Sequence, residues 1–193
     1  MNGSCESSVL YLTGPHAAGK TELCGHLTSE YNFGVVETGG LMRGLYADRG
    51  PQYRELSMGE YVRAVEKDDS DFFGNMLVDR VKRVVLEGAS PVIINGMRTY
   101  SYINSTTERL GTKSAKVLWI EANRDLLLER YNRREGRSLC PEEFEALLAF
   151  DMNLGISEIR EKADAIVVNE GRVDSFKEET DKILFEWGFI GMV

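Results

Sequence analysis

Residues 14–21 read Gly-Pro-His-Ala-Ala-Gly-Lys-Thr, which is a glycine, four intervening residues and then Gly-Lys-Thr. The glycines allow backbone N–H groups to turn inward around a phosphate, and a helix that starts here adds the positive end of its dipole. The pattern indicates a loop that holds ATP or a related triphosphate, whereas the alternative is a purely structural glycine turn. We expect Lys20 to reach the β and γ phosphates and Thr21 to bind Mg²⁺ through its hydroxyl. The remaining nucleotide contacts are expected at Gly14, His16, Ala17, Ala18 and Gly19.

A strand and a helix are needed to hold such a loop. Val9–Thr13 is a run of β-forming residues that stops at Gly14, and Thr21–Tyr31 has the pattern of a helix. Further strands are predicted at 34–37, 91–94, 116–121 and 165–168, and later helices at 124–134, from Pro141 onward and at 174–187. We expect Thr38 to cap the helix that follows the second strand. The alternation predicts an α/β protein, a three-layer P-loop NTPase fold whose five-stranded parallel sheet has helices on both faces.

The second and third strands are separated by residues 38–90, many more than the dozen or so that a parallel crossover requires. Residues 72–86 carry apolar side chains three or four positions apart, as an amphipathic helix does. We therefore expect one domain over residues 1–193, with a core of 8–48, 91–134 and 152–193. Acceptor-binding helices are expected to be inserted at about 49–90, and a short lid is expected at about 130–150.

The net charge of −8 argues against broad, sequence-independent binding of nucleic acid, although a local basic cleft is compatible with it. Apolar runs are far shorter than a membrane-spanning helix, and residues 1–8 lack the basic flank and apolar stretch of a secretory signal. The three cysteines (Cys5, Cys24 and Cys140) have no spacing typical of zinc ligands or a disulfide framework. We expect a soluble, cytoplasmic protein that is a monomer or a homodimer.

Charged residues follow the ends of two predicted strands. Arg43 comes after the second strand and Arg98 after the third, and the carboxyl ends of parallel strands border one crevice. Either arginine could clamp an acceptor phosphate through paired hydrogen bonds. Glu37 ends the second strand, where it could act as a base or orient Mg²⁺, or could instead be an ordinary carboxylate at a helix entry.

Four arginines lie close together at 130, 133, 134 and 137. Like charges three or four residues apart destabilise a helix unless an anion or a carboxylate neutralises them. Glu129 can pair with Arg133, which leaves Arg130 and Arg134 to bind phosphate; the alternative is a charged helix face. The polar residues 135–139 that follow suggest a lid that closes over the site and excludes water.

The order of these segments resembles the nucleoside monophosphate kinases, most closely the adenylate-kinase-like and dephospho-CoA-kinase-like predicted kinases of archaea. After the phosphate loop, the resemblance is carried by Glu37-Thr38-Gly39-Gly40-Leu41-Met42-Arg43, Asn95-Gly96-Met97-Arg98, Glu129–Arg134 and Asn169-Glu170-Gly171. It implies an ATP- and Mg²⁺-dependent kinase whose acceptor is bound by Thr38, Gly39, Arg43, Arg98 and Arg137. It also implies that Arg130, Asn169 and Gly171 contact ATP and that Asn95 joins Thr21 at the metal. The catalytic residues are then expected to be Lys20, Arg98, Arg134 and Glu37.

Two positions depart from that family. Asn95 stands where the family usually has an aspartate that assists Mg²⁺ through water, so the metal site is either weaker or served by another carboxylate. Residues 146–151 read Ala-Leu-Leu-Ala-Phe-Asp where the family often has one or more arginines. Arg133, Arg134 or Arg137 would then have to supply the missing charge.

Three functions are compatible with these features. The first is transfer of the γ-phosphoryl group of ATP to a nucleotide, most readily a ribo- or deoxyribonucleoside monophosphate. The second keeps the kinase chemistry but uses a hydroxyl acceptor, such as a hydroxymethyl pyrimidine in DNA, which a basic stripe among Arg43, Arg54, Arg63, Arg80, Lys82 and Arg83 would favour. The third is a nucleotide-binding regulatory protein with little catalysis.

Overall fold

The computed structural model describes residues 7–69, 71–112, 114–136, 138–153 and 155–191. Its five strands form one sheet in the order β2-β3-β1-β4-β5, and every neighbouring pair is parallel. The strands are β1 (Val9–Thr13), β2 (Gly34–Glu37), β3 (Val92–Asn95), β4 (Ala115–Glu121) and β5 (Ala165–Val168). Each bound lies within one residue of the sequence prediction. The predicted α/β fold with a five-stranded parallel sheet is confirmed.

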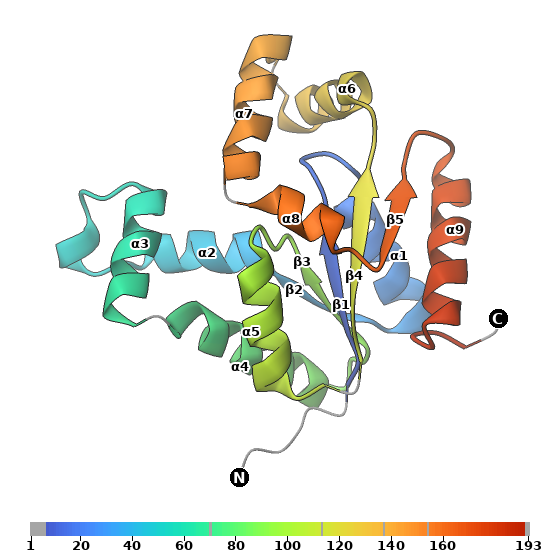
Figure 1. Cartoon of the computed structure of the whole chain (residues 1–193), viewed down its shortest axis with the longest axis horizontal. Helices are drawn as coiled ribbons and strands as arrows, with labels where there is room; N and C mark the ends of the chain where they lie inside the picture. The colour runs from blue at the N-terminus through green and yellow to red at the C-terminus, as the bar shows by residue number, and fades with distance from the viewer. Residues whose placement is uncertain (1–6, 70, 113, 137, 154, 192–193) are drawn as a thin grey trace.

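Helices cover both faces of the sheet, because successive side chains of a buried strand point to opposite faces. One face, which includes Val9 and Tyr11 of β1, packs against α4 (Phe72–Leu86), α5 (Tyr100–Leu110) and α8 (Ile156–Glu161). The other face, which includes Leu10 and Leu12, packs against α1 (Lys20–Tyr31), α6 (Arg124–Glu135), α7 (Pro141–Asn153) and α9 (Val173–Glu186). Figure 1 shows the sheet between these two layers.

Between β2 and β3 the chain forms α2 (Thr38–Ala47), a short 3₁₀ helix at Pro51–Tyr53, α3 (Met58–Asp68) and α4. The predicted helix at 72–86 is confirmed, and α4 packs on β2 through part of the sheet core. By contrast, α2 and α3 extend away from the sheet, on the left in Figure 1. A third, small cluster of Tyr61, Val65 and Phe73 holds α3 to α4.

The prediction that Thr38 caps α2 is wrong. The N-cap residue is Glu37, without a side-chain cap, and Thr38 is the first helical residue. The Thr38 side chain is buried, and its hydroxyl donates to the backbone carbonyl of Asn95 at 2.9 Å. A buried hydroxyl must find a partner, and the end of the neighbouring strand supplies one.

Among the described residues, no helix is both long enough and apolar enough to cross a membrane. The loop after β1 and the helices α6 and α7 lie beyond the carboxyl ends of the strands, at the top of Figure 1. In an open parallel sheet this edge is where ligands bind.

Candidate functional site

The loop between β1 and α1 has a backbone that side chains would obstruct. Gly14 has φ 140° and Gly19 has φ 109°, in the region that favours glycine. A Cβ atom at position 14 would lie 2.1 Å from the backbone oxygen of Ile120 on β4. A Cβ at position 19 would lie 2.3 Å from Nδ2 of Asn169, which follows β5. The glycines thus let the loop sit directly against the two neighbouring strand ends.

Lys20 begins α1 and folds back over the loop. Its amine donates to the carbonyl oxygens of Gly14 at 2.8 Å and Pro15 at 2.7 Å. The charged end of the side chain is therefore inside the curve of the loop, where the sequence pattern places phosphates. Thr21, the next residue, is exposed in the first turn of the helix.

Asn169 joins the loop to the opposite side of the crevice. Its amide donates to the carbonyl of Ala18 at 2.8 Å, and its own backbone carbonyl accepts from Nη1 of Arg130 at 2.9 Å. Its Oδ1 atom is buried and has no hydrogen-bond partner among the described residues. The structure therefore brings Asn169 and Arg130, both predicted to contact ATP, to the end of the loop, while Gly171 is exposed just beyond them.

A carboxylate and an amide meet at the ends of β2 and β3. Glu37 and Asn95 are opposite one another in the register of the two strands, and Nδ2 of Asn95 donates to Oε1 of Glu37 at 2.7 Å. Asn95 is buried, whereas Glu37 is exposed. The hydroxyl of Thr13, the last residue of β1, donates to the carbonyl of Met97 at 3.1 Å and ties the next segment to the loop.

Arg98 reaches the phosphate loop itself. One of its guanidinium nitrogens, Nη2, lies 3.4 Å from Nε2 of His16. The His16 ring packs edge-on against Tyr131 of α6, with ring centroids 6.0 Å apart. The guanidinium of Arg134 lies over the same Tyr131 ring, 5.3 Å from its centroid, and Nε of Arg134 pairs with Glu135. A chain of side chains therefore crosses the loop from the end of β3 to α6.

The segment predicted to be a lid, about 130–150, contains the end of α6 and most of α7. Asn132 hydrogen-bonds to both the backbone N–H and the carbonyl of Leu139, which closes the turn between the helices. Phe144 of α7 is buried and its ring lies 5.6 Å from that of Tyr131. The predicted pairing of Glu129 with Arg133 is confirmed. Arg137 lies outside the described residues.

Two acceptor candidates lie on α2, beside β2. Gly39 is exposed, and a Cβ there would lie 3.2 Å from Nη1 of Arg43, so the arginine folds back over this glycine. Arg43 is exposed as well. Thr38, in the same turn, is buried, and its hydroxyl donates to the backbone carbonyl of Asn95.

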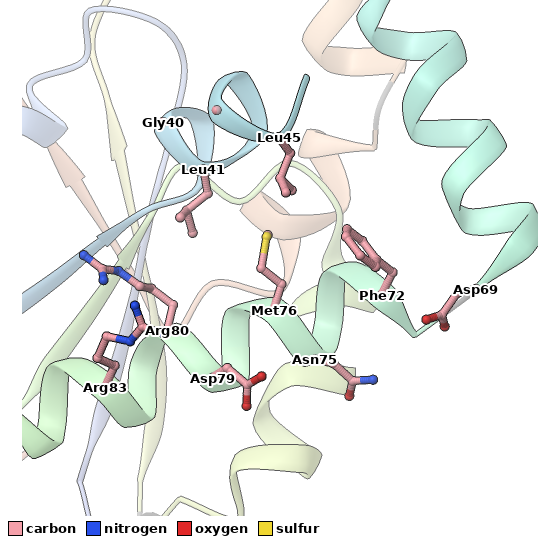
Figure 2. Close-up of a pocket in the computed structure, with 11 residues that line it drawn as sticks. Gly40, Leu41, Leu45, Asp69, Phe72, Asn75, Met76, Asp79, Arg80 and Arg83 are labelled. Carbon is pink, nitrogen blue, oxygen red and sulfur yellow. The ribbon is translucent and has the colours of Figure 1, made fainter. Parts of the chain in front are cut away.

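A cavity of about 660 Å³ lies between α2 and α4 (Figure 2). Leu41 and Leu45 of α2 face Met76 and Phe72 of α4, and Arg80 and Arg83 project from α4 at one end. Asp69 and Asp79 also line the cavity, so the arginines do not make it uniformly basic. Of these lining residues, Arg80 and Arg83 were considered from the sequence as part of a basic stripe, but the cavity was not predicted, because it needs both α2 and α4 to be placed.

A divalent ion would find few protein ligands here. Among the described residues, no group of three or more His, Cys, Asp and Glu side chains could hold a metal. The hydroxyl of Thr21 in the first turn of α1 and the carboxylate of Glu37 at the end of β2 are both exposed, and Oδ1 of Asn95 is a buried acceptor without a partner among the described residues. Such a sparse oxygen set fits Mg²⁺, which keeps several waters and takes the rest of its ligands from substrate phosphates.

Comparison with known proteins agrees with this geometry. A family model described as an AAA domain matches residues 13–146. A UPF0200 protein of Pyrococcus abyssi is 25% identical over 180 residues, which cover 91% of this chain and 95% of the relative. Among solved structures, TT1252 of Thermus thermophilus superposes with a TM-score of 0.64 at 18% identity, over 94% of this chain and 98% of that one. The shikimate kinase of Aquifex aeolicus gives 0.57 at 18% identity, over 95% and 99%.

The match to the family model covers most of the chain, including the phosphate loop, the strand-end residues and α6. The structural neighbours share the fold over nearly their whole length. The expected resemblance to P-loop kinase-like proteins is confirmed, and so is the P-loop kinase-like fold.

Proposed function

The chain belongs to the AAA domain family, and on that premise we propose that it is an ATP- and Mg²⁺-dependent phosphotransferase. The acceptor we propose is a nucleotide, most readily a ribo- or deoxyribonucleoside monophosphate. We place the reaction in a reducing cytoplasm, in keeping with Cys24 and Cys140, which are both free thiols. A monomer or a homodimer is equally suited to this chemistry.

The observation that carries the proposal is the position of Arg98 against the phosphate loop, 3.4 Å from His16. Phosphoryl transfer is catalysed mainly by positioning and by neutralising the charge that spreads over the transferring group. An arginine from the end of β3 that already touches the donor loop can contact that group as well as an acceptor phosphate.

On the donor side, the amine of Lys20 would exchange the carbonyls of Gly14 and Pro15 for the β- and γ-phosphate oxygens. Arg130 and Asn169 would border the other end of the nucleotide. Thr21 would hold Mg²⁺ through its hydroxyl. When bound, Mg²⁺ would neutralise part of the charge of the triphosphate.

On the acceptor side, Thr38, Gly39 and Arg43 would border the nucleotide that receives the phosphoryl group. We propose a phosphate-bearing acceptor because Arg43 and Arg98 both follow the carboxyl ends of parallel strands, which border one crevice, and arginine binds phosphate through two parallel hydrogen bonds. We propose that residues 49–90 are an acceptor-binding insertion in a single domain. We also propose that residues 130–150 close over the site as one piece, since Phe144 packs on Tyr131.

The test is a phosphoryl-transfer screen with ATP and Mg²⁺ against ribo- and deoxyribonucleoside monophosphates, dephospho-CoA and hydroxymethyl-pyrimidine DNA. Lys20→Ala is expected to lower the transfer rate by about 10²–10³-fold, the cost of removing one pre-organised donor from a transferring group. Lys182→Ala, an exposed lysine on α9, is the matched control and should leave the rate unchanged. Transfer to none of these acceptors, or equal rates for Lys20→Ala and the wild type, would contradict the proposal.

A further inference from the structure

The pair formed by Glu37 and Asn95 is built into the sheet. The two residues are register partners at the carboxyl ends of β2 and β3, and the amide nitrogen lies 2.7 Å from the carboxylate oxygen. Paired residues of neighbouring strands point to the same side of a sheet, so this contact follows directly from the strand pairing. The position of the carboxylate is therefore set by the backbone as well as by its own rotamer.

Asn95 is held firmly enough to fix its partner. Asn95 is only 4% exposed, and the hydroxyl of Thr38 donates a hydrogen bond to its backbone carbonyl. The orientation of its amide is determined too, because turning Oδ1 toward Glu37 would place two acceptors against one another. Asn95 thus offers a donor in one direction only.

A carboxylate at position 95 would not give the same arrangement. Two carboxyl groups at this distance cannot both be ionised, so one would take a proton or the pair would separate. An amide beside Glu37 leaves one full negative charge, with a defined direction, at the exposed edge of the crevice. The negative charge therefore lies on Glu37 at the end of β2, and its partner Asn95 at the end of β3 is neutral.

That charge lies near the phosphate loop. The buried thiol of Cys24, one turn after Lys20 on α1, has its pKa raised to about 12, chiefly by burial and next by the negative charge of Glu37. The positive charge of Lys20 lowers the same pKa. One thiol thus feels both charges, and α1 packs against β2 and β3, so the Glu37 carboxylate at the end of β2 lies near the first turns of α1.

From this geometry we propose that Asn95 is a positioning residue, whose amide aims the Glu37 carboxylate at the hydrated divalent cation that accompanies ATP. The inference rests on the proposed function and adds to it the identity of the acidic group. With the cation bound, Glu37 would accept hydrogen bonds from water of its hydration shell, and the hydroxyl of Thr21 would hold the cation itself. Asn95 acts through Glu37 and does not itself need to touch the cation.

The experiment exchanges the two groups. The variants are Asn95→Asp, Glu37→Gln and the double variant that carries both changes. The double variant again has one amide and one carboxylate, but the amide is now on β2 and the carboxylate on β3. The matched control makes the same two changes on the exposed face of α5, as Asn104→Asp with Glu108→Gln. For each protein, calorimetry gives the affinity for ATP with Mg²⁺ and with a chelator, thermal unfolding gives the folded fraction, and the acceptor screen gives the transfer rate.

The expected result is that the Mg²⁺-dependent gain in ATP affinity falls about 10–100-fold in each single variant, the usual cost of losing an outer-shell partner of a metal site. The double variant should recover most of that gain, and the α5 controls should match the wild type. Affinity measured with the chelator should be unchanged throughout, because the pair acts on the hydrated cation.

Three outcomes would overturn the inference: single variants that match the wild type, a double variant no better than the weaker single variant, or an Asn95→Asp protein with a stronger dependence on Mg²⁺. The last result would make position 95 a direct ligand. These outcomes are distinct from failure of the proposed function, in which the wild type binds ATP with Mg²⁺ yet transfers nothing. In that case the binding series still decides whether the pair positions the cation.

Discussion

The phosphate-loop region, residues 9–31 with 165–171, and the α2–α3 region, residues 38–68, are held in place by different means. In the first, β1 is wholly buried and the loop backbone touches β4 and Asn169 so closely that positions 14 and 19 have no room for a side chain. In the second, α2 buries Thr38 alone and α3 buries only Tyr61 and Val65. One region is fixed by backbone contact and the other by a few side chains.

This difference suggests that the two regions have different roles in binding. Rigid backbone donors suit a triphosphate, whose shape is the same for every turnover. A weakly anchored helical segment opens at lower free energy than the core, as ligand-closing segments must. We therefore expect the phosphate-loop region to be ready before ATP arrives and the α2–α3 region to become ordered when the acceptor binds.

The largest effect is expected from Gly14→Ala. The new Cβ would meet the Ile120 carbonyl at 2.1 Å while φ is 140°, so both a clash and backbone strain result. We expect a loss of at least about 4 kcal/mol in the free energy of unfolding, measured by denaturant titration, together with loss of ATP binding.

Gly25→Ala is the matched control, because it lies inside α1 and nothing lies within 4 Å of its added Cβ. This variant should gain up to about 1 kcal/mol, since alanine favours a helix more than glycine does. A Gly14→Ala protein as stable as Gly25→Ala would show that the close approach of the loop backbone to β4 is not needed for stability.

The same contrast explains which features the sequence could predict. The phosphate loop, β1 and β2 followed from local patterns, because strand, glycine loop, helix and second strand follow one another within residues 9–37. Arg98 and Glu37 could be assigned to one edge because parallel strands end together. Even the pairing of Glu129 with Arg133 followed from helical spacing.

Features that depend on contacts between residues far apart in sequence could not be predicted from local patterns. The bond between Thr38 and Asn95 joins residues far apart in sequence, and it overrode the local preference of threonine for a cap. The contact of Asn95 with Glu37, and of Arg98 with His16, depends on the order of strands and on side-chain rotamers. The cavity between α2 and α4 requires both helices to be placed before it can be seen.

The next largest effect is expected from two substitutions, one beside each region, that remove a buried ring. Phe73→Ala removes a buried ring from the small cluster that holds α3, which should lower the opening free energy of α3 by about 3 kcal/mol. Hydrogen exchange should then speed up in α2 and α3, with ATP affinity unchanged. Phe176→Ala removes an equally buried ring beneath Gly19 and should weaken ATP binding as well. Equal loss of ATP affinity in both variants would mean that the two regions are one cooperative unit.

A smaller effect is expected from Asn169→Ala. The change leaves the Ala18 carbonyl without its donor, which costs about 1–2 kcal/mol of stability. Because Arg130 binds the backbone of residue 169, that contact should survive, so ATP affinity should fall without being lost. Calorimetry and thermal unfolding measure both quantities, with Asn104→Ala on the exposed face of α5 as the control. An unchanged ATP affinity would show that Asn169 supports the fold but not the nucleotide site.

The smallest effect concerns pH and the start of α3. The hydroxyl and backbone N–H of Ser57 both donate to the Glu60 carboxylate, which holds the pKa of Glu60 below its usual range. A lowered pKa in the folded state stabilises α3 above the ordinary glutamate pKa of about 4.3, and this stabilisation is lost as the pH falls through the folded value. Hydrogen-exchange protection factors of α3 should therefore fall in acid, while those of α1 change less.

Glu60→Gln tests that reading, because it keeps the size of the side chain and removes its titration. The variant should show lower protection of α3 at neutral pH and little further loss in acid, and Glu66→Gln, later on the same helix, serves as the control. An acid response of α3 that persists in Glu60→Gln would assign the pH sensitivity to other groups. It would also indicate that the α2–α3 region is held more strongly by its small apolar cluster than by its helix cap, which would narrow its difference from the phosphate-loop region.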